Sequence, residues 1–242
     1  LVIFPFEEAL YQAAGVPVSF VGHPLVDAVR PAPDRGAFLR EVGLDPARPV
    51  VALLPGSRRA EIAHNLPPLA ASLPLFQARR PDLQFLVARA PGLPDRLFDV
   101  PLAGRNERVV EGRSHAVVGS AALALVATGT ATVETALLGT PMIVVYRLSA
   151  LTYFLGRPFV NVPHYAMPNL VADRRIVPEV IQSDFTPDRV AAEGLRLLED
   201  PEEAEKMRRE LALVRLKLGA PGASRRAAEV VHGLLAQGIR NA

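Results

Sequence analysis

One stretch decides the fold: Leu123-Ala-Leu-Val-Ala-Thr-Gly-Thr-Ala-Thr-Val-Glu-Thr-Ala-Leu-Leu-Gly-Thr-Pro-Met-Ile-Val-Val-Tyr-Arg147. Two apolar runs, 123–126 and 142–146, are typical of strands that are buried on both faces. Between them the sequence predicts a helix from about residue 131 to residue 138, because Gly139 and Pro141 end it. Strand, helix and strand in this order indicate an α/β fold with a doubly wound parallel sheet.

The turn before that helix has the composition of an anion site. Gly129 lets a ligand approach the backbone, and we expect the Thr130 hydroxyl to cap free amide groups of the first helical turn. A helix amino end at the carboxyl edge of a parallel sheet attracts phosphate. Glu134 lies one turn further on the same side of the helix. It is either a group that binds ligand hydroxyls or a solvated acid that the helix dipole favours.

Composition excludes several classes of protein. The chain has 242 residues, of which 50% are hydrophobic, and a formal net charge of +2, which does not favour a nucleic-acid partner. It has no cysteine, so disulfides and cysteine-ligated metals are excluded, and a cytosolic location is permitted. The chain opens on the apolar run at Leu1 without Met or a basic signal region, and we therefore expect a fragment of a longer protein.

The remaining chain continues the alternation of strands and helices. Residues 1–27 are predicted to be the last strand, helix and strand of a preceding domain, with strands at 1–6 and 16–22. The proline-rich segment 31–36 is the predicted linker. Residues 28–242 form the second domain, with further strands at 50–54, 83–88 and 108–110 and three helices at its carboxyl end.

A second phosphate-suited loop, Pro55-Gly-Ser-Arg-Arg-Ala-Glu61, follows the strand at 50–54. Arginine guanidinium groups match diphosphate oxygens, although an ordinary surface loop would have the same composition. Glu61 is expected to pair with Arg59 at the surface. The next helix is predicted to begin near Leu66 with Asn65 as its cap, and Pro74 to kink or shorten it.

Three other features leave alternatives open. Asn169 either caps a helix or binds sugar hydroxyls. The aromatic segment from Leu148 to Phe159 is predicted to be a helix that is either buried or in contact with a membrane surface. His23 and His164 have no second ligand at a suitable spacing, so no metal site is expected, and His115 is interpreted as structural.

Six motifs read in order resemble one family. The sequence resembles the bacterial lipid A disaccharide synthases, and the resemblance extends along all 242 residues. The motifs are Phe4-Pro-Phe-Glu7, Phe20-Val-Gly-His23, Leu53-Leu-Pro-Gly-Ser-Arg58, Ala127-Thr-Gly-Thr-Ala-Thr-Val-Glu134, Pro141-Met-Ile-Val-Val-Tyr-Arg147 and Pro168-Asn-Leu170.

The resemblance implies an inverting glycosyltransferase of the GT-B fold, with this chain as its second, donor-binding Rossmann-like half. Such an enzyme transfers diacylglucosamine from a UDP-linked donor to a lipid monosaccharide 1-phosphate and forms a β-1,6-linked disaccharide. No metal or other cofactor is implied. The implied location is cytoplasmic, peripheral to the inner membrane, and a homodimer is compatible with the family.

Residue roles also follow from the resemblance. Arg58 is implied to be catalytic by neutralising the departing UDP, Glu134 to bind the ribose, Asn169 to lie near the donor and Arg147 near the uridine. The general base is expected in the first half of the enzyme, so this chain alone is expected to be inactive. The implied donor-binding residues are Gly56, Ser57, Arg58, Thr128, Gly129, Thr130, Glu134, Arg147 and Asn169.

Two alternatives to this function stay open. One is an enzyme similar to UDP-N-acetylglucosamine 2-epimerase, which has the same architecture but needs acidic residues in its cleft. The other is a non-catalytic nucleotide-sugar-binding subunit that completes its site with a separate chain.

Overall fold

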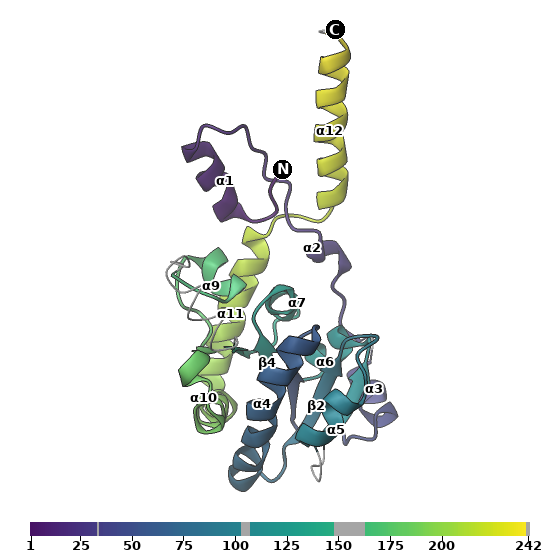
Figure 1. Ribbon diagram of the computed structural model, residues 1–242, viewed down its shortest axis with the longest axis vertical. Helices are drawn as coiled ribbons and strands as arrows, with labels where there is room; N and C mark the ends of the chain where they lie inside the picture. The colour runs from purple at the N-terminus through teal and green to yellow at the C-terminus, as the bar shows by residue number, and fades with distance from the viewer. Residues whose placement is uncertain (33, 103–106, 148–162, 241–242) are drawn as a thin grey trace.

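A six-stranded parallel sheet forms the centre of the protein, which we describe from a computed structural model (Figure 1). The structure describes residues 1–32, 34–102, 107–147 and 163–240. The strand order is β3-β2-β1-β4-β5-β6, and each neighbouring pair is parallel, so the predicted doubly wound sheet is confirmed. The strands are β1 (Val50–Leu54), β2 (Gln84–Arg89), β3 (Glu107–Glu111), β4 (Leu123–Ala127), β5 (Met142–Tyr146) and β6 (Glu179–Ile181).

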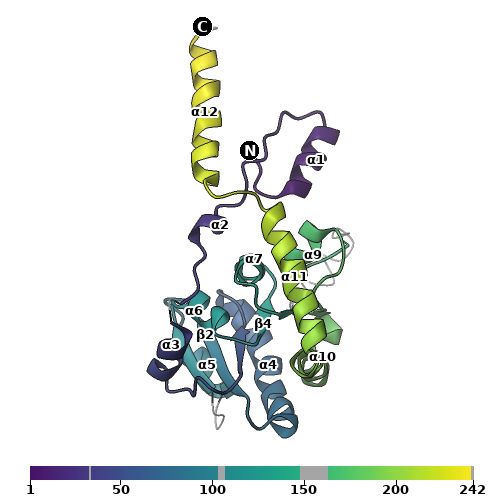
Figure 2. The ribbon, with the colours of Figure 1, turned by 180° about the vertical axis from the view of Figure 1, so that it is seen from behind.

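The two central strands carry the apolar runs that the sequence predicted to be buried. Every residue of β1 and β4 is buried, because helices cover both faces of the sheet. On one face α4 (Arg59–Arg79) packs against α5 (Arg96–Leu102) and α10 (Pro187–Glu199). On the other, α6 (Ser114–Gly119) packs against α3 (Arg35–Glu41) and α7 (Thr130–Leu137), as Figures 1 and 2 show.

Helix α4 differs from its prediction. It begins at Arg59 rather than near Leu66, and it continues through Pro67, Pro68 and Pro74 to Arg79. Asn65 is therefore no cap but a fully buried residue inside the helix. Each internal proline removes a backbone hydrogen bond. The helix persists because its apolar face is buried against the sheet, and tertiary packing supplies most of the stability of a helix in a protein.

Residues 1–27 form less strand than predicted. A single parallel bridge joins Val2 to Phe20, and α1 (Pro5–Ala13) begins inside the segment 1–6 that was predicted to be a strand. Proline is favoured in the first turn of a helix, which explains the early start at Pro5. Pro17 has no amide donor, which weakens the second predicted strand. Whether this segment belongs to a separate domain stays a prediction.

The carboxyl-terminal helices agree with the sequence. They are α10, α11 (Pro201–Lys217) and α12 (Ala223–Arg240), and α12 extends away from the sheet at the end of the molecule where α1 also lies (Figures 1 and 2). The His23 amide donates to Leu218 O at 2.8 Å, and Gly222 N donates to Asp27 Oδ2 at 2.8 Å. These bonds fix α2 (Leu25–Ala28) and the segment before it to the turn between α11 and α12.

The helix expected at 148–159 lies outside the described residues. Within the part of the chain that is described, no helix combines the length and the apolar character needed to cross a bilayer. The short helix α9 (Met167–Ala172) and strand β6 come later in the chain. The sequence does not predict β6, because three residues are too few to show an alternation of apolar and polar side chains.

Gly194 tests the packing of α10 on the sheet. A Cβ atom at this position would lie 2.4 Å from Phe76 Cζ and 3.0 Å from Leu123 Cδ2. We expect Gly194→Ala to lower the free energy of unfolding by roughly 1–3 kcal/mol through overpacking, in spite of the better helix propensity of alanine. Chemical denaturation measures this. Gly233→Ala in α12, where a Cβ would meet no atom within 4 Å, is the control and should not destabilise the protein.

Candidate functional site

Two glycine turns lie side by side at the carboxyl edge of the sheet. Strands β1 and β4 pair in the register Leu54 to Val126, and a glycine follows each strand after one further residue. Gly56 and Gly129 both have φ of 130°, which residues with a side chain rarely adopt. The strand order also reverses between β1 and β4, where open α/β sheets bind their ligands.

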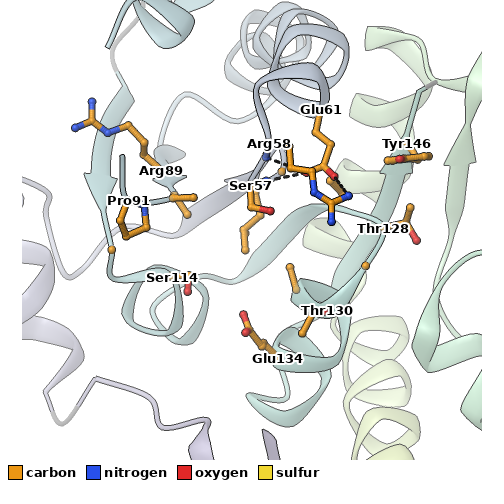
Figure 3. A pocket seen from close by; sticks show the side chains of 18 residues that line it. Ser57, Arg58, Glu61, Arg89, Pro91, Ser114, Thr128, Thr130, Glu134 and Tyr146 are labelled. Carbon is orange, nitrogen blue, oxygen red and sulfur yellow. Dashed lines mark hydrogen bonds and ion pairs between the residues drawn. The ribbon is translucent and has the colours of Figure 1, made fainter. Parts of the chain in front are cut away.

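A cavity of about 510 Å³ opens between these turns (Figure 3). Its volume lies in the range of small-molecule and cofactor sites. Its far wall comes from the ends of β2 and β3 and the start of α6, and Tyr146 of β5 borders it on the other side. The structure brings these predicted residues together around the cavity: Gly56, Ser57, Arg58, Thr128, Gly129, Thr130 and Glu134. What they bind stays a prediction.

Arg58 carries the accessible positive charge of the cavity. Its side chain is 83% exposed, and its guanidinium lies 3.6 Å from Glu61 Oε1. The predicted pair of Glu61 with Arg59 is therefore wrong: Arg58 is the cap residue of α4, and Glu61 reaches back to it in a capping box. Arg59, the first residue of α4, is exposed and does not line the cavity.

The second arginine of the cavity wall is neutralised. The Arg89 guanidinium points away from the cavity (Figure 3), where it pairs with Asp95 and with Glu111 at 2.5 Å. The hydrogen bond from Arg89 holds the pKa of the Glu111 carboxyl below its usual range. Among the described residues that line the cavity, Arg58 is thus the cation available to an anionic ligand.

The start of α7 corrects the expected cap. Gly129, not Thr130, is the cap residue, and no described side chain caps the helix. Thr130 is the first helical residue and is exposed to the cavity. The Thr128 hydroxyl donates to Tyr165 O at 2.6 Å, which ties the turn to the segment before α9. The uncapped amino end of α7 leaves backbone amide groups for a ligand.

Glu134 faces the cavity from the second turn of α7. Its Oε2 atom lies 3.8 Å from His115 Nε2 of α6, and its side chain is largely buried. His115 therefore contacts a residue that lines the candidate site, and its interpretation as a structural residue stays a prediction. A carboxylate at this depth, beside the two turns, can accept hydrogen bonds from ligand hydroxyls.

Arg147 is placed differently from the prediction. Its guanidinium lies over the Phe185 ring, 5.2 Å from the ring centroid, and donates to the carbonyl oxygens of Gln182 and Phe185. It does not line the cavity. In this structure it joins the end of β5 to the turn before α10, so contact with a uridine would require a different side-chain position.

Asn169 is neither a helix cap nor a cavity residue here. It is fully buried within α9, whose cap residue is Ala166. Its Nδ2 donates to Val177 O and Glu179 Oε1, at 3.0 and 2.8 Å, and its Oδ1 accepts from the amides of residues 176 and 177. All of its polar positions are used within the protein, which makes it a structural link between α9 and β6.

Asn65 is a site-supporting residue that the sequence interpretation missed. Its Nδ2 donates to Pro55 O at 2.9 Å, and its Oδ1 accepts from Arg147 N at 3.0 Å. It thereby joins the end of β1 to the end of β5 at the edge of the sheet that carries the cavity. Its buried, helix-interior position could not be recognised while the prolines after it indicated a helix start.

Other residues that line the cavity, Ala90, Pro91 and Ser114, were also missed by the sequence interpretation. The sequence places the end of β2 at the same edge, which was a usable signal for Ala90 and Pro91, and the helix start at Ser114 was a signal for the far wall. Over the described ranges, no group of three or more histidine, aspartate or glutamate residues is arranged to hold a metal ion.

Solved structures with this architecture show to which class of fold it belongs. The UDP-N-acetylglucosamine 2-epimerase of Neisseria meningitidis, solved with UDP-GlcNAc, aligns with a TM-score of 0.66 at 14% identity, over 96% of this chain and 61% of that chain. Sucrose-phosphate synthase of Thermosynechococcus elongatus aligns with a TM-score of 0.58 at 18% identity, over 98% and 58% of the two chains. The fold is that of the GT-B glycosyltransferases and the related epimerases.

Sequence comparison identifies the family within that class. Residues 1–232 match the family model described as Lipid-A-disaccharide synthetase, and the chain belongs to this family. It is 45% identical over 240 residues to the lipid-A-disaccharide synthase of Geobacter sulfurreducens and 42% identical over 241 residues to that of Myxococcus xanthus. The alignments cover 98% of this chain but 62% and 63% of those relatives, so the chain spans less than two thirds of their length.

Asn65 gives a test of how the site is supported. Asn65→Ala would leave the Pro55 carbonyl and the Arg147 amide buried without their partner, and each such loss costs roughly 1–3 kcal/mol. We expect a fall of at least that size in the free energy of unfolding, measured by chemical denaturation. Ser57→Ala, in the exposed turn nearby, is the control. An Asn65 variant as stable as the unaltered chain would contradict the proposed link between β1 and β5.

Proposed function

We propose that this chain is the donor-binding half of a glycosyltransferase of lipid A biosynthesis. The donor is UDP-linked diacylglucosamine, the acceptor is a lipid monosaccharide 1-phosphate, and the product is the β-1,6-linked disaccharide. The observation that carries the proposal is the cavity at the switch point of the sheet, with the Arg58 turn on β1 facing the uncapped start of α7 on β4. Family membership supports the choice of reaction.

The diphosphate and the ribose of the donor bind to different residues of the cavity. The diphosphate lies between the Arg58 guanidinium and the amide groups at the start of α7, where positive charge and helix dipole both favour it. The ribose hydroxyls donate to Glu134. This placement puts the sugar of the donor toward the open side of the cavity.

In the reaction, the bond between the sugar anomeric carbon and the diphosphate oxygen breaks as the acceptor hydroxyl oxygen attacks that carbon. Negative charge grows on the departing UDP, and Arg58 stabilises it. A general base takes the proton of the acceptor hydroxyl. We propose that this base and the acceptor pocket lie in the part of the relatives that this chain does not span, and that the 242 residues alone bind donor without turnover.

The lipid substrates support a place for the enzyme at the cytoplasmic surface of the inner membrane, as a peripheral protein. Recovery of the coding sequence upstream of Leu1 separates the fragment reading from a split system, because only a split system would encode the other half on a separate chain. A sugar-nucleotide epimerase is the second candidate by fold, and the family match favours the transferase.

Nucleotide binding tests the proposal directly. Calorimetry should show that the folded chain binds UDP, and Glu134→Ala should weaken binding by about 1.5–3 kcal/mol, the value of a lost hydrogen bond to a charged group. The free energy of unfolding should change little. If UDP affinity is unchanged while stability falls, Glu134 is a structural acid. A folded chain that does not bind UDP at all would refute the donor-binding function.

Arg58 should act mainly in the transition state, where the diphosphate charge is largest. In the enzyme with the full length of its relatives, Arg58→Ala should lower kcat by roughly 10²–10³-fold, the scale for one lost charge-stabilising donor. Arg58→Lys should restore only part, because an ammonium cannot bridge two oxygens as a guanidinium does. Steady-state rates at saturating donor measure this, with Arg59→Ala as the matched control. If Arg59→Ala is the more damaging variant, the wrong guanidinium has been assigned.

A further inference from the structure

The carboxylate of Glu61 already occupies the amide groups of the turn after β1 (Figure 3). Its Oε2 atom accepts hydrogen bonds from Ser57 N at 2.8 Å and from Arg58 N at 3.2 Å. Its Oε1 atom lies 3.6 Å from the Arg58 guanidinium, and the side chain is only 19% exposed. A diphosphate in the cavity therefore meets the side chains of this turn, while its backbone donors are held by Glu61.

Gly56 shows how closely Glu61 is seated on the turn. A Cβ atom at Gly56 would lie 2.6 Å from the Cβ of Glu61 and 2.6 Å from its Oε2. Real Cβ atoms do not approach other atoms so closely, because packing at that distance is strongly repulsive. The glycine of this turn is thus required by the Glu61 side chain. Gly129, its counterpart on β4, has no atom within 4 Å of such a Cβ and leaves its turn open to a ligand.

A comparable carboxylate arrangement is found at Glu7, away from the cavity. Glu7 Oε2 accepts from Ile3 N at 3.3 Å and from Phe4 N at 3.1 Å at the start of α1. A glutamate on two amide groups is therefore, by itself, a means of starting a helix. Glu61 differs because the residues that it holds, Ser57 and Arg58, line the cavity.

We propose that Glu61 is a positioning residue for the diphosphate site, which rests on the function proposed above. By fixing the backbone of residues 57 and 58, it holds the Ser57 hydroxyl and the Arg58 guanidinium at the cavity before the donor arrives. Preorganised donors bind an anion more tightly than mobile ones, because less conformational freedom is lost on binding.

Glu61 also has an effect that opposes the binding of an anion. The negative charge of Glu61 lies near the expected diphosphate and repels it. Its ion pair with Arg58 involves an 83% exposed side chain, and such pairs contribute little. The two amide hydrogen bonds are charge-assisted and fix the path of the backbone. We therefore expect the positioning effect to exceed the repulsion.

Binding of UDP and of uridine to the same variants tests the proposal. Glu61→Ala should weaken UDP by about tenfold, whereas Glu61→Gln, which keeps an oxygen for the amide groups, should weaken it by no more than about threefold. Uridine has no phosphate, and its affinity, titrated by NMR to millimolar concentration, should stay within about twofold of the unaltered chain. Glu7→Ala, the matched control, should leave both affinities unchanged.

Three outcomes would overturn this assignment. If both Glu61 variants bind UDP as tightly as the unaltered chain, or more tightly, Glu61 is a helix cap or a competitor of the phosphate. Equal losses of UDP and uridine affinity would mean general damage to the cavity. If the unaltered chain binds uridine and UDP equally well, the cavity has no diphosphate site, and the proposed function fails together with the positioning role.

Discussion

The parallel pairing of β1 with β4 is the constraint on which the rest of the site depends. Because Leu54 stands opposite Val126, the two glycine turns that follow the strands open at the same edge of the sheet, within one residue of each other in the register. The chain leaves β1 toward β2 and leaves β4 toward β5, so the helices after these strands cover opposite faces and a crevice forms between them. The buried Asn65 amide reinforces this edge by joining the ends of β1 and β5.

Two arginines border the crevice, and their different ion pairs make one of them accessible to a ligand and the other not. Arg89 is held by two carboxylates behind the cavity wall and contributes shape rather than free charge. Arg58 stays accessible because its carboxylate partner lies at 3.6 Å and mainly binds the backbone. A cation that is anchored at its backbone and free at its guanidinium can gain contacts as charge develops on a leaving group, which is the requirement for catalysis by differential binding.

The sequence predicted the frame of the protein better than its supporting contacts. Buried strands appear as short apolar runs, so β1 and β4 were found with correct or nearly correct bounds, and the helix at 131–138 corresponds to Thr130–Leu137. The turns at Gly56 and Gly129 were recognisable because glycine and hydroxyl residues directly follow those runs. Binding roles for the residues of these turns stay predictions.

Long-range contacts could not be predicted, because they depend on the folded chain. Pro67 and Pro68 are typical of a helix start and predict Asn65 as its cap, yet α4 already begins at Arg59. Arg147 and Asn169 belong to the family motifs, but their side chains bind other parts of the protein. Arg147 donates to backbone carbonyls, and Asn169 binds a backbone carbonyl, backbone amides and Glu179. Glu61 was visible in the sequence, and only its geometry shows that it holds Arg58 rather than Arg59.

A crystal structure of this chain grown with UDP tests the central claim most directly. We expect the diphosphate between the Arg58 guanidinium and the amide groups at the start of α7, with the ribose hydroxyls at Glu134 and the Glu61 carboxylate still on the amides of residues 57 and 58. UDP bound away from the edge shared by β1 and β4, or with its phosphates turned away from both glycine turns, would contradict it.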